Sequence, residues 1–198
     1  VLSLLGSSCQ FLPFPYHALF YANKAQHPDF LLPEHFILAT LHRAENTDSP
    51  ERLQSIIAAL EEIAREMPVV IPIHPRTRKK LQELNFNFKQ TRLQLVDPVG
   101  YLEMVYLLKH CSLVATDSGG LQKEAYFFKK YCITLRTETE WVELVEQGAN
   151  IITGWRYEDI LNSYKQLKHT TKDVFSSPLY GDGQAGHIII RELQRIDS

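Results

Sequence analysis

From Phe36 onward, short apolar runs alternate with segments whose apolar residues recur at helical spacing. The apolar runs predict strands at residues 36–41, 69–73, 93–96, 112–116, 132–135 and 149–153. The segments between them predict helices at residues 50–66, 76–84, 100–109, 121–129, 140–146 and 158–168. Near-continuous apolar strands separated by amphipathic helices are typical of a parallel sheet covered on both faces. The pattern therefore predicts an α/β fold with a doubly wound, mainly parallel, Rossmann-like sheet.

The two ends of the chain depart from this alternation. Residues 1–35 are predicted to be an irregular segment, with a short helix at 17–25 and a proline-containing linker at 27–33. The Rossmann-like domain is predicted to span 36–198, and it closes with a helix over 184–196 after a glycine-rich turn. The sequence thus predicts one domain preceded by a linker.

Composition and charge argue against several classes of protein. The chain has 198 residues and a formal net charge of -2, and no lysine or arginine run exceeds three residues, so no nucleic-acid surface is expected. No apolar run is long enough to cross a membrane. Cys111 and Cys132 lie in apolar runs, which predicts buried free thiols and a cytoplasmic location. The spacing of histidine, cysteine and carboxylate residues predicts no metal site, and no cofactor is expected.

The most informative segment is a short apolar strand followed by Ser118, Gly119 and Gly120 and then by a helix. Adjacent glycines let the backbone approach a ligand closely, and the helix directs unpaired N–H groups and its positive dipole end at the turn. This arrangement favours an anion, and diphosphate above all. Glu124 lies one helical turn beyond Gly120, from where it can reach a sugar hydroxyl, and Gln122 supplies an amide beside it. The alternative is that Ser-Gly-Gly merely caps a helix.

A second polar cluster, His42, Arg43, Glu45 and Asn46, follows the first predicted strand. In a sheet of the usual order the first and fourth strands are neighbours, and their connections leave in opposite directions. The cluster and the glycines are therefore expected to meet at this switch point, where ligands bind. A capping or core histidine is the alternative for His42.

Two further groups follow the second and fifth strands. His74, at the end of the second strand, either lines the same pocket or caps the next helix. Arg136, Glu138 and Glu140 place a cation and two acids on the same edge of the sheet. These groups extend the predicted site along the carboxyl ends of the strands.

Six motifs now occur in order along the chain. They are His42-Arg43-x-Glu45-Asn46, His74-Pro75-Arg76, Asp97-Pro98-x-x-Tyr101, Ser118-Gly119-Gly120-x-Gln122-x-Glu124, Arg136-x-x-Thr139-Glu140 and Tyr180-Gly181-Asp182-Gly183-x-Ala185. The set resembles the C-terminal domain of the UDP-N-acetylglucosamine 2-epimerase family, non-hydrolysing type, over residues 36–195. A single motif would be weak, but the ordered series is specific.

The resemblance implies the two-domain GT-B architecture, with UDP-sugar between two Rossmann-like halves, of which this chain is one. It implies that Ser118, Gly119 and Gly120 bind the diphosphate and Glu124 the ribose. It also implies that His42 assists departure and return of the glycosidic phosphate. The other residues expected to bind UDP or substrate are Arg43, Glu45, Asn46, His74, Met104, Gln122, Arg136 and Glu140.

The family interconverts UDP-N-acetylglucosamine and UDP-N-acetylmannosamine by anti elimination of UDP and its re-addition. Two positions depart from its pattern, because Met104 replaces a phenylalanine beside the uracil and Trp141 replaces an arginine that contacts substrate. The family's C2 acid/base carboxylates belong to an N-terminal domain, which this chain lacks. The isolated chain is therefore expected to retain a nucleotide half-site and to lack catalysis, and a homodimeric assembly is left open.

Three alternatives remain at this point. A GT-B UDP-sugar glycosyltransferase would leave C2 of the sugar unchanged, whereas an epimerase needs no acceptor. A hydrolysing epimerase would release free UDP as a stoichiometric product. A non-catalytic UDP-sugar-binding paralogue is the third, motivated by Trp141 and the missing half.

Overall fold

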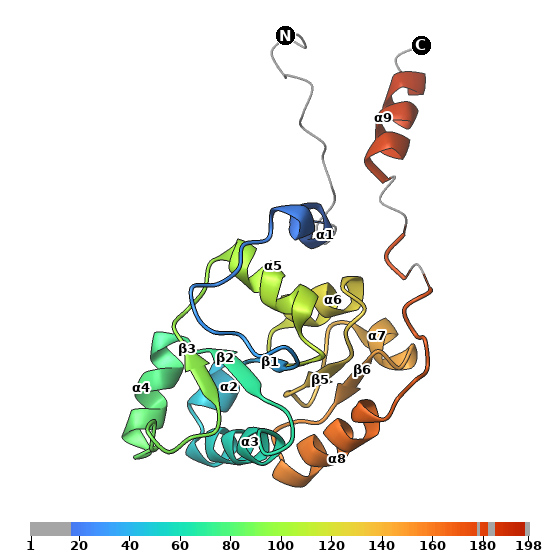
Figure 1. The fold of residues 1–198 in the computed structure, drawn as a ribbon. Helices are drawn as coiled ribbons and strands as arrows, with labels where there is room; N and C mark the ends of the chain where they lie inside the picture. The colour runs from blue at the N-terminus through green and yellow to red at the C-terminus, as the bar shows by residue number, and fades with distance from the viewer. Residues whose placement is uncertain (1–16, 178, 182–184, 197–198) are drawn as a thin grey trace.

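Short apolar segments form one parallel sheet in the part of the chain that the computed structural model describes, residues 17–177, 179–181 and 185–196. The strands are β1 (Ile37–Thr40), β2 (Val69–Pro72), β3 (Gln94–Val96), β4 (Leu113–Thr116), β5 (Cys132–Thr134) and β6 (Asn150–Ile152). Their order is β3-β2-β1-β4-β5-β6, and every neighbouring pair is parallel. This order confirms the predicted doubly wound sheet and places its reversal between β1 and β4 (Figure 1).

The described helices and one 3-10 turn are as follows. They are α1 (His17–Tyr21), η2 (Ala22–Lys24), α2 (Ala44–Thr47), α3 (Pro50–Ile63), α4 (Pro75–Glu83), α5 (Tyr101–His110), α6 (Gly119–Phe127), α7 (Val142–Glu146), α8 (Tyr157–Lys168) and α9 (Ala185–Ile196). Helix α3 begins where Ser49 accepts a hydrogen bond from the N–H of Arg52, with Pro50 at the first helical position. The α9 helix stands apart from the sheet in Figure 1.

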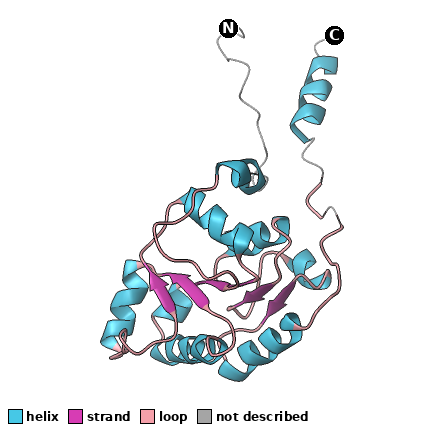
Figure 2. Cartoon of the chain, viewed as in Figure 1, coloured by secondary structure: helices cyan, strands magenta, loops and turns pink. Residues whose placement is uncertain are grey.

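The sheet is the middle of three layers, as the magenta strands between cyan helices show in Figure 2. Alternate residues of β1 point to opposite faces, because side chains in a strand alternate with a period of two. Ile37 and Ala39 join the buried cluster formed with α3 and α8. Phe36 and Leu38 join the cluster formed with α5 and α6. Neither face of β1 is exposed to solvent, which explains why its sequence is almost continuously apolar.

Two helix starts near the sheet reversal differ from the predictions. Helix α6 begins at Gly119 rather than at residue 121, so the two glycines form its first turn instead of preceding it. Helix α2 occupies Ala44–Thr47, where no helix was predicted. The α6 difference arises because glycine in a first helical turn resembles glycine in a loop. The α2 difference arises because Asp117, far away in the sequence, accepts from the N–H groups of His42 and Arg43 just before this helix. The other boundaries shift little; α3, for example, ends at Ile63 instead of 66.

The N-terminal segment packs against α5. A short α-helix and a 3-10 turn replace the single helix predicted over 17–25. The N–H of Gln26 donates to the carbonyl of Leu102 at 3.2 Å, and the rings of Tyr21 and Tyr101 meet edge to face with centroids 5.8 Å apart. Residues 182–184 of the predicted glycine-rich turn lie outside the described residues. The division at residue 35 stays a prediction.

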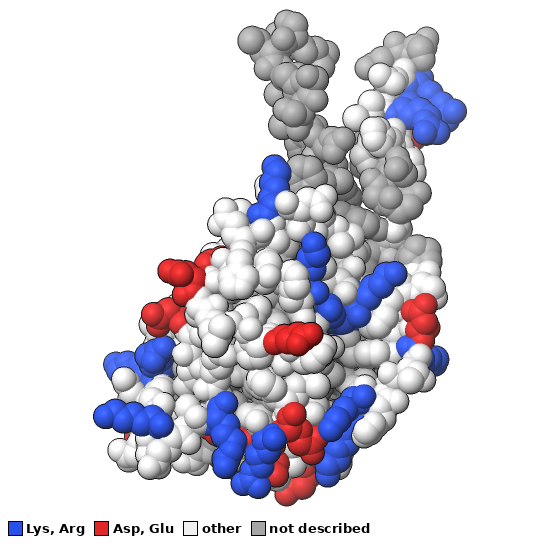
Figure 3. Space-filling view, viewed as in Figure 1, with Lys and Arg blue, Asp and Glu red and all other residues white. Residues whose placement is uncertain are grey.

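The distribution of charge on the surface bears on the prediction that no nucleic-acid surface is present. On the face seen in Figure 3, lysine and arginine side chains interleave with aspartate and glutamate along the lower edge. Among the described residues, no helix combines the length and apolarity that crossing a membrane requires. Cys111 and Cys132 are buried free thiols, as predicted.

Candidate functional site at the sheet reversal

The site is built where β1 and β4 run side by side and end together. Their residues pair in parallel register up to Thr40 opposite Thr116, and the two hydroxyl oxygens lie 2.5 Å apart. Beyond this point the chain turns into α2 on one side and into α6 on the other (Figure 1). The carboxyl ends of these strands therefore open a crevice at the switch point, the usual ligand position in such sheets.

Asp117 holds the two sides of the crevice together. Its side chain is 0% exposed, and its carboxylate accepts hydrogen bonds from the N–H groups of His42 and Arg43 and from Nδ2 of Asn46, at 2.9–3.3 Å. Nδ2 of Asn46 also donates to the carbonyl of Leu135, at 2.8 Å. A buried carboxylate needs such donors, since an unpaired one would carry a large desolvation cost. Asp117 thus fixes the start of α2 from the end of the neighbouring strand β4.

The N-terminus of α6 faces the same crevice. Ser118 caps the helix, its Oγ accepting from the N–H of Leu121 at 3.5 Å, and the N–H of Ser118 donates to Oγ1 of Thr116 at 2.9 Å. Gly119 and Gly120 are the first two helical residues, so the helix itself provides no acceptor for their N–H groups. With the positive end of the helix dipole, these N–H groups have the arrangement that favours an anion.

A cavity of about 300 Å³ occupies this end of the sheet. It is lined by Thr40, Leu41, His42, Pro72, His74, Pro98, Val99, Met104, Ser118, Gly120, Leu121 and Glu124. Its polar groups are the helix end, two histidines and one carboxylate, and the rest of its wall is largely apolar. The cavity combines positions for an anion, for a hydroxyl and for a flat apolar group.

A larger hollow, of about 500 Å³, lies on the other side of the sheet between α3 and α4, with Glu61, Arg65 and Phe86 among its lining residues. It has no glycine-bearing helix end and does not adjoin the strand ends of the reversal. The smaller cavity is therefore the better candidate, because chemistry rather than size distinguishes the two.

Glu124 meets Tyr101 at the edge of the cavity. The hydroxyl of Tyr101 donates to Oε1 of Glu124, at 3.4 Å. Burial raises the pKa of Glu124 above its usual range, and the Tyr101 hydrogen bond opposes this rise. Burial, with the charge of Glu124 adding to it, raises the pKa of Tyr101 to about 12. Tyr101 is therefore a protonated donor at neutral pH.

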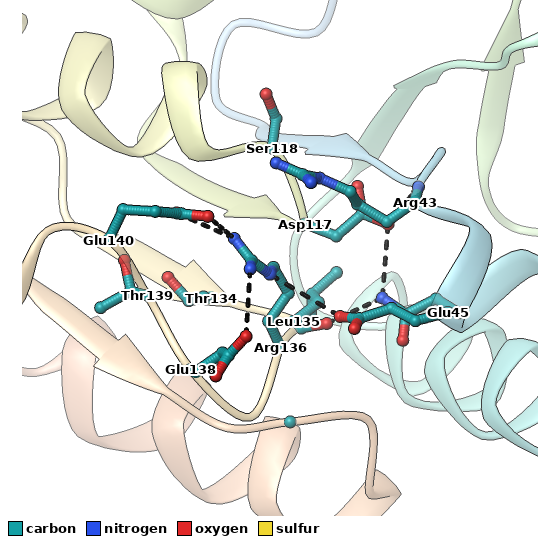
Figure 4. A network of polar contacts seen from close by, with 12 residues as sticks. Arg43, Glu45, Asp117, Ser118, Thr134, Leu135, Arg136, Glu138, Thr139 and Glu140 are labelled. Carbon is teal, nitrogen blue, oxygen red and sulfur yellow. Dashed lines mark hydrogen bonds and ion pairs between the residues drawn. The ribbon is translucent and has the colours of Figure 1, made fainter.

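Arg136 is the centre of an ionic network (Figure 4), and Glu140 of this network lies next to Gly119. Its guanidinium is 7% exposed and donates from Nη1 to both carboxylate oxygens of Glu140, at 2.9 Å. Glu45 lies 3.6 Å and Glu138 3.8 Å from other nitrogens of the same guanidinium. The Arg136 hydrogen bond is the main reason that the pKa of Glu140 is lowered. Figure 4 also shows the guanidinium of Arg43 directed toward Ser118.

The structure divides the predicted site residues into two groups. Those that line the cavity are His42, His74, Met104, Ser118, Gly120 and Glu124. Those that lie beside it are Arg43, Glu45, Asn46, Gly119, Gln122, Arg136 and Glu140. His74 also caps α4, because its Nδ1 accepts from the N–H of Arg76 at 3.2 Å. His74 therefore both lines the cavity and caps a helix, two roles that the sequence left as alternatives.

Gln122 is a predicted ligand residue whose side chain lies in the core. Its side chain is buried, and its Oε1 accepts from Oγ1 of Thr139 at 2.6 Å and from Nδ2 of Asn150 at 3.0 Å. These contacts tie α6 to β6 and to the loop before α7. The Gln122 amide therefore holds in place the first turn of α6, which contains the two glycines. A direct contact between Gln122 and a ligand stays a prediction.

Trp141 also supports the glycine turn. Its Nε1 donates to the carbonyl of Gly119 at 2.7 Å, and its ring packs edge to face on Tyr180. Nζ of Lys123 lies over both rings, 3.9 Å from the Trp141 centroid and 4.0 Å from that of Tyr180. The indole thus occupies the outer side of the α6 N-terminus rather than the cavity.

Asp117 and Tyr101 are the two residues whose contributions sequence reasoning missed. Tyr101 lies within a quoted motif and Asp117 immediately precedes one, but neither was assigned a contact. A buried acid immediately before a Ser-Gly-Gly turn is a usable signal, since an acid at the end of an apolar strand needs donors. Among the described residues, no group of three histidine, cysteine or carboxylate side chains is arranged to hold a metal ion.

Comparison with known proteins identifies the family to which this chain belongs. The chain matches the family model of UDP-N-acetylglucosamine 2-epimerase over residues 16–194. A UDP-2,3-diacetamido-2,3-dideoxy-D-glucuronate 2-epimerase from Pseudomonas aeruginosa is 50% identical over 182 residues, covering 90% of this chain and 50% of that protein. A UDP-N-acetylglucosamine 2-epimerase from Methanocaldococcus jannaschii is 39% identical over 168 residues, covering 82% of this chain and 45% of that protein.

The fold agrees with these sequence matches. The solved structure of the Methanocaldococcus jannaschii UDP-GlcNAc 2-epimerase in complex with UDP-GlcNAc and UDP superposes with a TM-score of 0.70 and 36% identity. The match covers 90% of this chain and 48% of that one, so the chain spans about half the length of the curated relatives it matches. The chain belongs to the UDP-N-acetylglucosamine 2-epimerase family.

Proposed function

We propose that this chain is the nucleotide-binding half of a UDP-sugar 2-epimerase. The observation that carries the proposal is the grouping of His42, Ser118, Gly120 and Glu124 around one cavity at the switch point. In this proposal the helix end holds the diphosphate, the acid one turn along holds the ribose, and the histidine opposite meets the departing phosphate of a UDP-sugar. The family membership supports the same assignment.

The cavity offers a position for each part of UDP. The diphosphate is placed at the N–H groups of Gly119 and Gly120, and the ribose at Glu124. The uracil is placed against the apolar wall that includes Val99 and Met104, because a thioether side chain can cover the flat face of a base. Arg43 adds positive charge beside the diphosphate position, whereas the charge of Arg136 is balanced by Glu45, Glu138 and Glu140.

The proposed reaction needs groups on both sides of the sugar. A base removes the proton from C2, the C1–O bond to UDP breaks, and UDP then returns to C1 while a proton is added to the other face of C2. His42 and the α6 N-terminus stabilise the negative charge on the departing diphosphate. The C2 acid and base belong to the rest of the protein in this proposal. A homodimeric state and a cytoplasmic location stay predictions.

The substrate is proposed to be a UDP-linked acetamido sugar, and two candidates are supported. UDP-N-acetylglucosamine is supported by the family model and by the Methanocaldococcus jannaschii relative. The 50% identity to a UDP-2,3-diacetamido-2,3-dideoxy-D-glucuronate 2-epimerase favours a diacetamido uronate instead. The complete protein should be incubated with each UDP-sugar alone and the products followed by NMR. Inversion at C2 identifies the substrate, unchanged C2 with an acceptor requirement identifies a transferase, and stoichiometric free UDP identifies a hydrolysing enzyme.

Replacing Glu124 with alanine is expected to weaken UDP binding by about 1.5–3 kcal/mol, because a hydrogen bond to a charged acceptor is lost. Pyrophosphate binding should change little, since pyrophosphate has no ribose. Isothermal titration calorimetry of both ligands measures the difference. Glu146→Ala, which removes an exposed carboxylate at the end of α7, is the control. Equal losses for UDP and pyrophosphate would rule out the ribose role.

The two glycines are expected to respond differently to alanine. A Cβ on Gly120 meets nothing within 4 Å and enters the cavity, so Gly120→Ala should keep the fold and weaken UDP about tenfold. A Cβ on Gly119 would lie 3.0 Å from Oε2 of Glu140, so Gly119→Ala should lower the free energy of unfolding by about 1 kcal/mol. Urea unfolding and calorimetry separate the two effects. Identical behaviour of the two variants would contradict this placement of the diphosphate.

A further inference from the structure

The side chain of Tyr101 reaches from one helix to the functional carboxylate of another. Tyr101 is the first residue of α5, and Glu124 lies on α6, whose N-terminus faces the crevice. The Tyr101 hydroxyl donates to Oε1 of Glu124, at 3.4 Å. Glu124 lines the cavity, whereas Tyr101 does not. The contact therefore acts on the carboxylate from outside the space that a ligand would fill.

The Tyr101 ring is supported on its other side. The ring of Tyr21, from α1, meets it edge to face with centroids 5.8 Å apart and an interplanar angle of 89°. Nζ of Lys24 lies 5.6 Å from the centre of the Tyr21 ring. Edge-to-face aromatic pairs hold rings in defined orientations. The N-terminal helix thus limits the positions open to the Tyr101 hydroxyl.

A single hydrogen bond to one oxygen has a geometric consequence for Glu124. A carboxylate has two oxygens that accept, and Tyr101 takes Oε1. The free rotation of the carboxylate about its last bond is thereby restricted, and Oε2 is left for a second donor. A ribose hydroxyl is such a donor, and its binding would cost less if the carboxylate is already oriented.

We propose that Tyr101 is a positioning residue that orients the Glu124 carboxylate for the ribose hydroxyls of a nucleoside diphosphate. This inference rests on the proposed function, because it assumes that Glu124 meets the ribose. Tyr101 itself touches no part of the ligand in this proposal. It acts through Glu124 alone, and its effect must vanish when Glu124 is absent.

The test uses Tyr101→Phe, which keeps the ring and its contact with Tyr21 and removes only the hydroxyl. UDP affinity is expected to fall about three- to tenfold, as for the loss of one hydrogen bond, while pyrophosphate affinity stays unchanged. In the Glu124→Ala background the same substitution should change UDP affinity no further. Tyr106→Phe is the matched control, because Tyr106 lies on the same helix and its ring stacks on His110.

A pH profile separates positioning from a general structural effect. The Tyr101 hydrogen bond lowers the pKa of Glu124, against the burial that raises it, so removing the hydroxyl should raise this pKa further. The ionised carboxylate is the form that accepts from ribose. UDP binding is then complete above the Glu124 pKa and is lost as pH falls through it, and in Tyr101→Phe this loss should begin at higher pH. The other titratable side chains of the cavity, His42 and His74, are unchanged in both proteins.

The outcomes distinguish this inference from the proposed function. If UDP does not bind the unsubstituted chain, both fail. If Glu124→Ala discriminates UDP from pyrophosphate but Tyr101→Phe matches Tyr106→Phe, only the positioning role fails. Additive losses in the double variant, or an unshifted pH profile, also overturn it. A selective loss for UDP that disappears without Glu124 supports it.

Discussion

Replacing Asp117 with alanine is expected to lower the free energy of unfolding by about 3 kcal/mol. The substitution leaves the N–H groups of His42 and Arg43 without their carboxylate acceptor, and Nδ2 of Asn46 loses one of its two. The Asn46 donor is buried and the two N–H groups are part of partly buried hydrogen bonds, so their lost partners are not fully replaced by water. Urea unfolding followed by circular dichroism measures the change.

A matched control is available on the surface. Asp173 also accepts one backbone N–H, from Phe175 at 2.9 Å, but it is exposed. Asp173→Ala should therefore change the free energy of unfolding by less than about 1 kcal/mol. Similar losses in both variants would show that the Asp117 hydrogen bonds contribute no more than a surface contact. UDP affinity should fall in Asp117→Ala only, because the His42 loop loses its anchor.

Replacing His42 with asparagine in the complete protein is expected to slow elimination of UDP by about a hundredfold. His42 lines the cavity opposite Ser118 and Gly120, and its Nδ1 lies 4.0 Å from Oδ1 of Asp117. Asparagine can still donate a hydrogen bond, but it carries no positive charge for the departing diphosphate. Exchange of the C2 proton with deuterated water, followed by NMR, measures the step.

His74→Asn is the control for this experiment. His74 lines the same cavity, but its Nδ1 accepts from the N–H of Arg76, and asparagine is an equally good helix cap. Its effect on exchange should therefore be much smaller. If exchange stays fast in His42→Asn and only UDP affinity falls, His42 serves binding and not departure of the leaving group.

The strands and the position of the crevice could be predicted because their signals are local. Apolar runs such as residues 36–41 identify buried strands by themselves, and regular alternation with helices implies the strand order. Ser118 and the glycines were likewise found from neighbouring residues. The N-terminus of α6 was misplaced only because glycine in a first helical turn resembles glycine in a loop.

The contacts that complete the site could not be predicted, because they join residues far apart in the sequence. The α2 helix depends on Asp117, about 75 residues from His42, so no local pattern indicates it. The ionic pairing of Arg136 with Glu45 and the hydrogen bond from Tyr101 to Glu124 depend on how separate crossovers pack. The residue types indicated which kinds of interaction the site could make, but the tertiary packing determined which residues interact.

The pairing of β1 with β4 links the crevice to the folding kinetics of the domain. Thr40 and Thr116, whose hydroxyls meet at its edge, are 76 residues apart, with two strands and four helices between them. Parallel pairs of such separation form only after the loop-closure entropy of the intervening chain has been overcome. The phosphate position therefore arises with global folding. A nucleotide bound there should slow amide hydrogen exchange throughout the sheet, by opposing global unfolding as a whole.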